Sequence, residues 1–277
     1  MAQTVLVTTD FSANSKAGIR FAVQLAAQTG SSLVFLNIIE ELRNPWLAEE
    51  SFTDKTLLKH QEKLNRFVSK VYKQAGVTPG NYTCVVRGGA PVDQCIIDYA
   101  LEEKVDLICM STQGAGVMGR LVGTLSSAIM ASSPIPVVVV PARYRRVPVT
   151  HLLYASDLQD LKHELDLVKS VAGPLDAAIS TVYFEYSPLL EVADQLVSKA
   201  EINHQTDRVT FMLKKATLEK SLPQHLNDEV HNSRPSMVVL FTKSNRSWLD
   251  RLFWPSNSAE LSFITKVPLL IFRKRPL

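Results

Sequence analysis

The stretch Val5-Leu6-Val7-Thr8-Thr9-Asp10 is a short apolar run, rich in β-branched residues, that ends in an aspartate. Leu152-Leu153-Tyr154-Ala155-Ser156-Asp157 repeats its shape 147 residues further along the 277-residue chain. Short apolar runs of this kind predict buried β-strands. Each run would therefore be the first strand of a half of the protein, with an aspartate at its carboxyl end.

A second pair of matching runs closes each half. Residues 107–112 lead to a strand at 136–140, and residues 237–242 lead to a similar strand at 268–272. Such a period indicates two copies of one domain. The sequence thus predicts domains at residues 1–143 and 149–277, joined by a short basic segment that ends in proline.

Strands and helices alternate along the first half. The expected strands are 4–9, 32–39, 82–86, 106–111 and 136–141, and the expected helices are 12–28 with Ser12 as N-cap, 53–75, 91–103 and 124–132. Alternation with continuously apolar strands predicts an α/β fold, a parallel sheet covered by helices on both faces. The second half begins and ends in the same way, but residues 185–235 are polar with little periodicity.

Composition excludes several classes of protein. The chain is 46% hydrophobic and 21% charged, with a net charge of +3, which is typical of a globular protein and too small a charge to indicate nucleic-acid binding. No apolar run is long enough for a membrane span. The three cysteines lack a Cys-x-x-Cys pair, which favours reduced thiols and a cytoplasmic location over disulfides or a zinc site.

A glycine-rich turn follows the fourth expected strand, over residues 110–124. Its glycines are Gly114, Gly116, Gly119 and Gly123. They allow positive φ angles and close approach to a ligand, and Thr124 opens a helix whose free N–H groups suit a phosphate. Arg120 could add a charged contact. The turn is not a Walker loop, and the alternative interpretation is a solvated strand-to-helix loop.

The second half lacks this turn. Of the 11 glycines only Gly173 lies beyond residue 147, and Pro255 stands where the first half has Gly123. A proline there removes a backbone N–H donor. Asp157 remains, without a phosphate loop to work with. The tail Arg273-Lys274-Arg275 is typical of a solvated basic cluster.

Several motifs together resemble a known family over essentially the full length of the chain. They are residues 6–12, 35–39, 89–91 and 106–110, and Gly123-Thr124 with residues 134–140. The chain resembles a tandem universal stress protein. That resemblance implies two Rossmann-like domains, each with a five-stranded parallel sheet in the order 3-2-1-4-5 and helices on both faces.

The resemblance also implies a ligand, ATP or another adenine nucleotide, with or without Mg²⁺. Asp10 would receive the ribose hydroxyls and the backbone of Ile38 would face the adenine. The phosphate contacts would come from Gly114, Gly123, Thr124 and Leu125, and the candidate set is completed by Thr8, Thr9, Met110, Ser111, Gly116, Gly119, Arg120 and Ser126. The chain departs from the family pattern because Ser111 replaces the first glycine and the loop is one residue shorter.

We therefore expect a cytoplasmic stress-response or signalling protein that binds a nucleotide in its first domain, with at most slow ATP hydrolysis. The second domain would be structural or regulatory. The two domains are expected to pair within the chain, whole chains could form a homodimer, and neither nucleic acid nor membrane is an expected partner. The alternative is a protein-interaction module whose nucleotide site has degenerated in both halves. An enzyme would need a reactive residue that the sequence does not reveal.

Overall fold

A computed structural model describes residues 3–40, 54–112, 124–186, 208–217, 219–242 and 267–274. It divides into two compact units, Met1–Arg146 (unit 1) and Val147–Leu277 (unit 2). Each unit is an α/β fold with a parallel sheet, as the sequence predicts. The described helices include none that is both long enough and apolar enough to cross a membrane.

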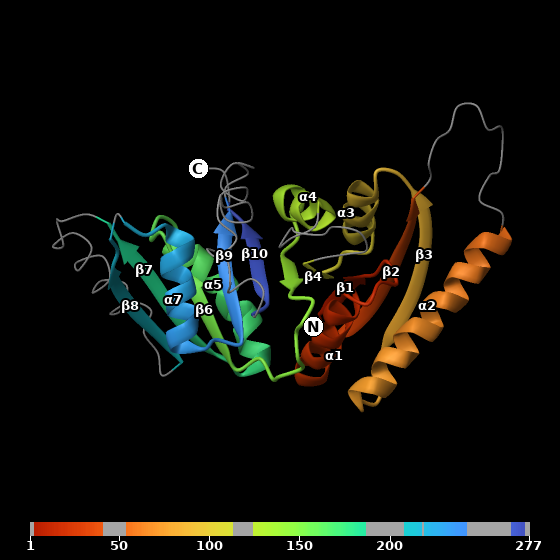
Figure 1. Ribbon diagram of the computed structural model, residues 1–277, viewed down its shortest axis with the longest axis horizontal. Coiled ribbons are helices and arrows are strands. Elements are labelled where there is room, and N and C mark those ends of the chain that lie inside the picture. Colours follow the sequence, from red (N-terminus) through yellow and green to blue (C-terminus); the bar gives the residue numbers. More distant parts are fainter. Residues whose placement is uncertain are drawn as a thin grey trace. The chain divides into compact units, whose positions relative to one another are not determined.

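In the described part of unit 1, five parallel strands and four helices follow one another (Figure 1). In chain order they are β1 (Thr4–Thr8), α1 (Lys16–Thr29), β2 (Ser32–Glu40), α2 (Asp54–Ala75), β3 (Tyr82–Gly89), α3 (Val92–Glu102), β4 (Leu107–Ser111), α4 (Thr124–Ser132) and β5 (Val137–Val140). The strand order is β3-β2-β1-β4-β5, which confirms the order that the family resemblance implies. Strands β1 and β4 are almost wholly buried because they are inner strands and helices cover both faces of the sheet, and β5 at the end of this order is buried as well.

Right-handed crossovers decide which face each helix covers. The chain moves from β1 outward to β2 and β3, then crosses back to β4 and β5. Right-handed connections therefore place α1 and α2 on one face and α3 and α4 on the other. The contacts agree, because α1 packs against α2 and α3 packs against α4. α1 also covers β1 and β4, so its first turn lies beside the ends of both strands.

The predicted boundaries need two corrections in unit 1. β3 continues to Gly89, three residues past the expected end. α1 begins at Lys16, not directly after Ser12, because residues 10–15 form a separate turn that is described below. Helix α3 starts at Val92 after Pro91, as expected from the preference for proline at helix starts.

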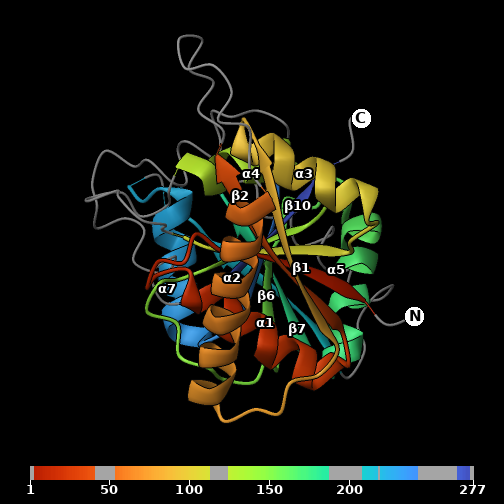
Figure 2. The same ribbon diagram turned by 90° about the vertical axis from the view of Figure 1, so that its right-hand side faces the viewer.

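Unit 2 repeats the arrangement. Its described elements are β6 (His151–Ala155), α5 (Leu161–Leu175), β7 (Ala178–Glu185), β8 (Val209–Lys215), α7 (Leu222–Ser233), β9 (Met237–Thr242) and β10 (Leu269–Arg273). Within the unit the strands run β8-β7-β6-β9-β10, the same order as in unit 1. Figure 2 shows α5 and α7 on opposite sides of the strands of unit 2.

The polar segment 185–235 holds two elements that its weak periodicity did not predict. Strand β8 pairs with β7 from Val209 to Lys215. Helix α7 follows Ser221, whose backbone N–H donates to Oε1 of Gln224 at 2.7 Å. A serine with a glutamine three residues later is a recognised helix-start signal, so this helix could have been predicted.

Candidate functional site

The candidate residues meet at the carboxyl edge of the unit 1 sheet. β1 is the central strand, paired with β2 on one side and β4 on the other. The chain leaves β1 through α1 and β4 through α4, and these helices cover opposite faces. This is the switch point at which open α/β sheets bind ligands. Asp10 follows β1, Ile38 lies near the end of β2, and Ser111 ends β4.

Asp10 lies in a tight turn between β1 and α1. Its Oδ1 accepts the backbone N–H of Ser12 at 3.0 Å, and Oγ1 of Thr9 accepts the N–H of Phe11 at 3.1 Å. Phe11 adopts a φ of 63°, which is rare for a bulky residue. Asp10 itself is exposed. The turn therefore holds the Asp10 carboxylate at the rim of the sheet, and it delays the start of α1 to Lys16.

Aromatic packing holds Phe11 in this unusual conformation. Its ring lies 5.7 Å from that of Phe67 in an edge-to-face arrangement and 6.1 Å from that of His60. The ammonium of Lys63 lies 4.2 Å from the centre of the Phe11 ring. These three contacts all come from α2, so the neighbouring helix supports the turn that carries Asp10.

Asn37 fixes the same turn from the other side and was missed at the sequence level. Its side chain is 5% exposed, and its Nδ2 donates to the carbonyl of Thr9 at 2.8 Å. Thr9 in turn donates its N–H to the carbonyl of Leu36 at 3.0 Å. Asn37 Oδ1 is buried and accepts no hydrogen bond from the part of the chain that the structure describes. The sequence signal that could have revealed it is an asparagine inside the otherwise apolar run of residues 33–39.

Ser111 has a structural task that its sequence position did not indicate. Its Oγ accepts the N–H of Gly18 at 3.0 Å and donates to the carbonyl of Asn14 at 2.8 Å. Gly18 lies in the first turn of α1, where helix N–H groups lack partners within the helix. Ser111 therefore caps helix α1 from strand β4, which is distant in the sequence. Its hydroxyl is thus engaged with α1 and not directed at a ligand.

Helix α4 is tied to the end of β4. Ser126 is buried, with 4% of its surface exposed, and its Oγ donates to the carbonyl of Ser111 at 3.0 Å. This bond joins the two flanks of the glycine-rich segment. Leu125 is half-buried beside it, whereas Met110 and Thr8 are buried strand residues.

The remaining candidates lie outside the described residues. They are Gly114, Gly116, Gly119, Arg120 and Gly123, and only the helical backbone of Thr124 is described. The described candidates Thr9, Asp10, Ile38, Ser111 and Ser126 are the ones that the fold gathers at the carboxyl edge.

Comparison with known proteins places the chain in a family. The sequence profile of the universal stress protein family matches residues 1–141. The chain belongs to this family. A curated relative, the universal stress protein in the QAH/OAS sulfhydrylase 3′ region of Thermus aquaticus, is 28% identical over 141 residues, which are 50% of this chain and 99% of the relative.

Solved structures extend the similarity. A universal stress protein from Archaeoglobus fulgidus matches 98% of this chain and 98% of its own, with a TM-score of 0.68 and 15% identity, which shows that the fold is shared over both units. A universal stress protein solved in complex with cAMP covers 50% of this chain and 97% of its own, with 25% identity and a TM-score of 0.37.

The second unit of this universal stress protein repeats the two hydrogen bonds and the positive φ of the turn between β1 and α1. Oγ of Ser156 accepts the N–H of Leu158 at 3.0 Å, and Oδ1 of Asp157 accepts the N–H of Gln159 at 3.1 Å. Leu158 has a φ of 62°, as Phe11 does in unit 1. Asp157 is therefore the structural counterpart of Asp10.

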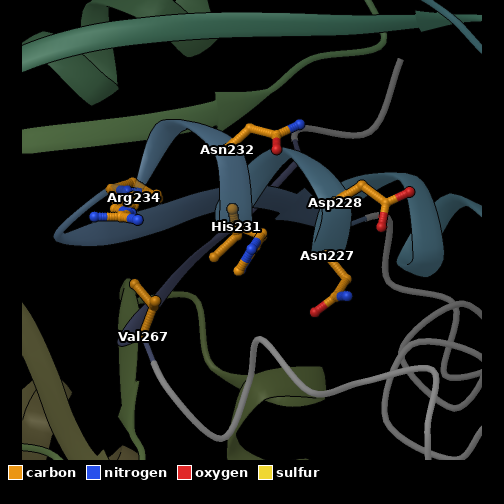
Figure 3. Close-up of a pocket in the computed structure, with 8 residues that line it drawn as sticks. Asn227, Asp228, His231, Asn232, Arg234 and Val267 are labelled. Carbon is orange, nitrogen blue, oxygen red and sulfur yellow. The ribbon is translucent and has the colours of Figure 1, made fainter.

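A separate cavity lies at the opposite end of the unit 2 sheet. It has a volume of about 590 Å³ and is lined by Asn227, Asp228 and His231 of α7, with Arg234 and Val267 (Figure 3). Arg234 and Val267 precede β9 and β10, so this cavity faces the amino ends of the strands. Ligands of open α/β sheets bind at the carboxyl ends, so the cavity is not part of the candidate site. Among the described residues, no group of three or more His, Cys, Asp or Glu side chains could hold a metal ion.

Proposed function

We propose that unit 1 of this universal stress protein binds an adenine nucleotide, ATP or a close relative. We propose further that the protein acts in a stress response by binding this nucleotide, without hydrolysing it rapidly. The observation that carries the proposal is the Asp10 carboxylate, exposed and held by a rigid turn at the switch point of the sheet. Ligands of open α/β sheets bind at this point.

The chemistry of Asp10 suits ribose. An ionised carboxylate has about four lone-pair sites and can accept hydrogen bonds from the hydroxyl groups of a ribose. Ser12 takes one site on Oδ1. Bonds to a charged acceptor contribute about 1.5–3 kcal/mol each, so a ribose diol would gain specific affinity from this one side chain.

The other parts of the nucleotide would meet neighbouring strand ends. Ile38 is half-buried near the end of β2, one residue after Asn37, whose buried Oδ1 is an acceptor without a partner in the described chain. Phosphates would meet the glycine-rich segment and the start of α4, a helix of nine residues, because the N–H groups of a first helical turn have no partner within the helix. If Mg²⁺ accompanies the nucleotide, the phosphates and the Asp10 carboxylate are oxygen ligands of the type it prefers.

Two measurements on the full chain test the proposal. Heat denaturation of purified protein, followed by chromatography of the supernatant, identifies any nucleotide that co-purifies. Calorimetric titration with ATP, cAMP and GTP then gives affinity and stoichiometry. We expect an adenine nucleotide at one site per chain.

Matched variants locate the site. Asp10→Ala should weaken nucleotide binding by about 1–3 kcal/mol, or roughly 5- to 150-fold, because it removes a charged acceptor. Asp157→Ala makes the same change at the counterpart position in unit 2 and should leave the affinity unaltered. Equal effects of both variants would place the site elsewhere. Absence of nucleotide binding by the wild-type chain would overturn the proposal and favour a protein-interaction module.

A further inference from the structure

Unit 2 carries a lysine at the place where unit 1 carries an alanine. In unit 1 Ser111 pairs with Val140, and in unit 2 Phe241 pairs with Phe272. Two residues past these paired strand positions stand Ala142 and Lys274, respectively. Both positions follow the last strand of their unit, and from this position Lys274 reaches the turn that carries Asp157.

Lys274 is held by two carboxylates. Its Nζ lies 2.6 Å from Oδ2 of Asp157 and 3.0 Å from Oε1 of Glu164. The side chain of Lys274 is 12% exposed and that of Glu164 is 3% exposed, so the ammonium is largely removed from water. Burial alone would lower the pKa of Lys274, but hydrogen bonds and attraction from Asp157 and Glu164 outweigh it and raise the pKa.

The same cluster continues into the core of unit 2. The Tyr154 hydroxyl donates to Oε2 of Glu164 and accepts a hydrogen bond from Oγ of Ser156. The tyrosine is fully buried, and burial is the largest cause that raises its pKa. In unit 1 the counterpart of Glu164, at the offset that relates Asp157 to Asp10, is Ala17. The charged cluster is therefore particular to unit 2.

We propose that Lys274 excludes nucleotide from unit 2 by occupying the Asp157 carboxylate. The inference rests on the proposed role of Asp10 in unit 1. Both oxygens of Asp157 are already used, Oδ1 by the N–H of Gln159 and Oδ2 by Lys274. A ribose hydroxyl would have to displace an ammonium from the carboxylate, replacing a hydrogen bond between two ionised groups by one in which only the acceptor is ionised.

Displacing the lysine would also disturb Glu164. Its carboxylate is buried and Lys274 is the cation that neutralises it in the structure. Separating a buried pair leaves an uncompensated charge, which is strongly unfavourable. The lysine is thus retained by Glu164 even when a competing ligand approaches Asp157. Lys274 acts as a specificity-determining residue, in addition to any effect of the loop that lacks glycine.

The sharpest test transfers the lysine to unit 1. Ala142 is half-buried at the position equivalent to Lys274, so Ala142→Lys should bring an ammonium to Asp10. Ala142→Met is the matched control, with similar length and no charge. We measure binding of ATP and of adenosine to each full-length variant by calorimetry, because adenosine has no phosphate that the new charge could attract.

We expect Ala142→Lys to weaken adenosine and ATP binding at least about tenfold relative to Ala142→Met. Equal affinities of the two variants, or tighter ATP binding by Ala142→Lys, would overturn the role of Lys274 while the proposed function stands. Failure of the wild-type chain to bind either ligand would instead refute the proposed function, and this inference with it.

A second readout does not depend on any engineered variant. Acylation of the native chain with a limiting amine-reactive reagent, followed by peptide mass spectrometry, compares Lys274 with the exposed Lys162 of the same unit. A paired and shielded ammonium should react at least about tenfold more slowly, because acylation requires the neutral amine. Similar rates for the two lysines would show that Asp157 is not held and would overturn the proposal.

Discussion

Replacing Ser111 by alanine tests whether this residue serves the fold or the ligand. The hydroxyl caps α1 from β4, accepting the N–H of Gly18 and donating to the carbonyl of Asn14. Gly18 is buried, so its N–H has no access to water once the serine is gone. Loss of a helix cap costs about 0.5–2 kcal/mol, and an unsatisfied buried donor costs about 1–3 kcal/mol.

We expect Ser111→Ala to lower the free energy of unfolding of unit 1 by about 1–2 kcal/mol, because both estimates describe the same lost bond. Ser111→Gly, which installs the glycine of the family pattern, should cost about 0.5–1 kcal/mol more through backbone entropy. Ser132→Ala is the control, since this exposed hydroxyl donates to the carbonyl of Ala128 within the same helix. Its effect should stay within about 0.5 kcal/mol.

Hydrogen exchange measured by mass spectrometry locates the effect within the chain. The Gly18 amide and its neighbours in α1 should lose about tenfold in protection for every 1.4 kcal/mol lost, while unit 2 peptides stay unchanged. Nucleotide affinity should change little, because the hydroxyl faces the helix. Unaltered α1 protection, or a loss of nucleotide binding at full stability, would refute the capping role and assign the hydroxyl to the ligand.

Three further changes probe the neighbouring interactions. Lys274→Met should destabilise unit 2 by about 3–5 kcal/mol in urea denaturation, and adding Glu164→Gln should recover most of the loss. Asn37→Leu should weaken nucleotide binding about 3- to 10-fold in calorimetry, because the bond that fixes Thr9 is worth about 0.5–1.5 kcal/mol. Burial lowers the pKa of His151 below its usual 6.5. The folded protein therefore binds this proton less readily than the unfolded chain, and the contribution of neutral His151 to stability should be complete above about pH 6.5 and be lost as the pH falls below it. His151→Asn should flatten the dependence of the free energy of unfolding on pH below about pH 6.5.

The sheet and the place of Asp10 could be predicted because they depend on local patterns. The runs at 107–111 and 137–140 are apolar almost throughout and form the buried strands β4 and β5. An aspartate directly after the first run must lie at the carboxyl edge of a parallel sheet. The helix start was wrong because Asp10 and Ser12 hydrogen-bond to nearby backbone and compete with helix formation.

The role of Ser111 could not be predicted, because its partner Gly18 is 93 residues away. No local pattern reports a cap that another strand supplies. Lys274 gives a similar lesson. Its neighbours in the sequence are basic, which is typical of a solvated tail, yet its side chain is 12% exposed and pairs with Asp157 across 117 residues. A run of basic residues reports only local composition. The side chain of Lys274 is largely buried because the residue directly follows strand β10, which brings it to the carboxyl edge of the sheet.

The strained residue beside each aspartate shows which features of the turn concern function. Phe11 and Leu158 share a positive φ that costs about 1–3 kcal/mol in most contexts. Both units retain it, including unit 2, where the aspartate is held by a lysine. The strain therefore belongs to the backbone turn, which Thr9 and Ser156 stabilise with the same hydroxyl bond. What differs between the units is side-chain chemistry, so a binding function for unit 1 must be argued from the Asp10 carboxylate and its neighbours and not from the unusual backbone.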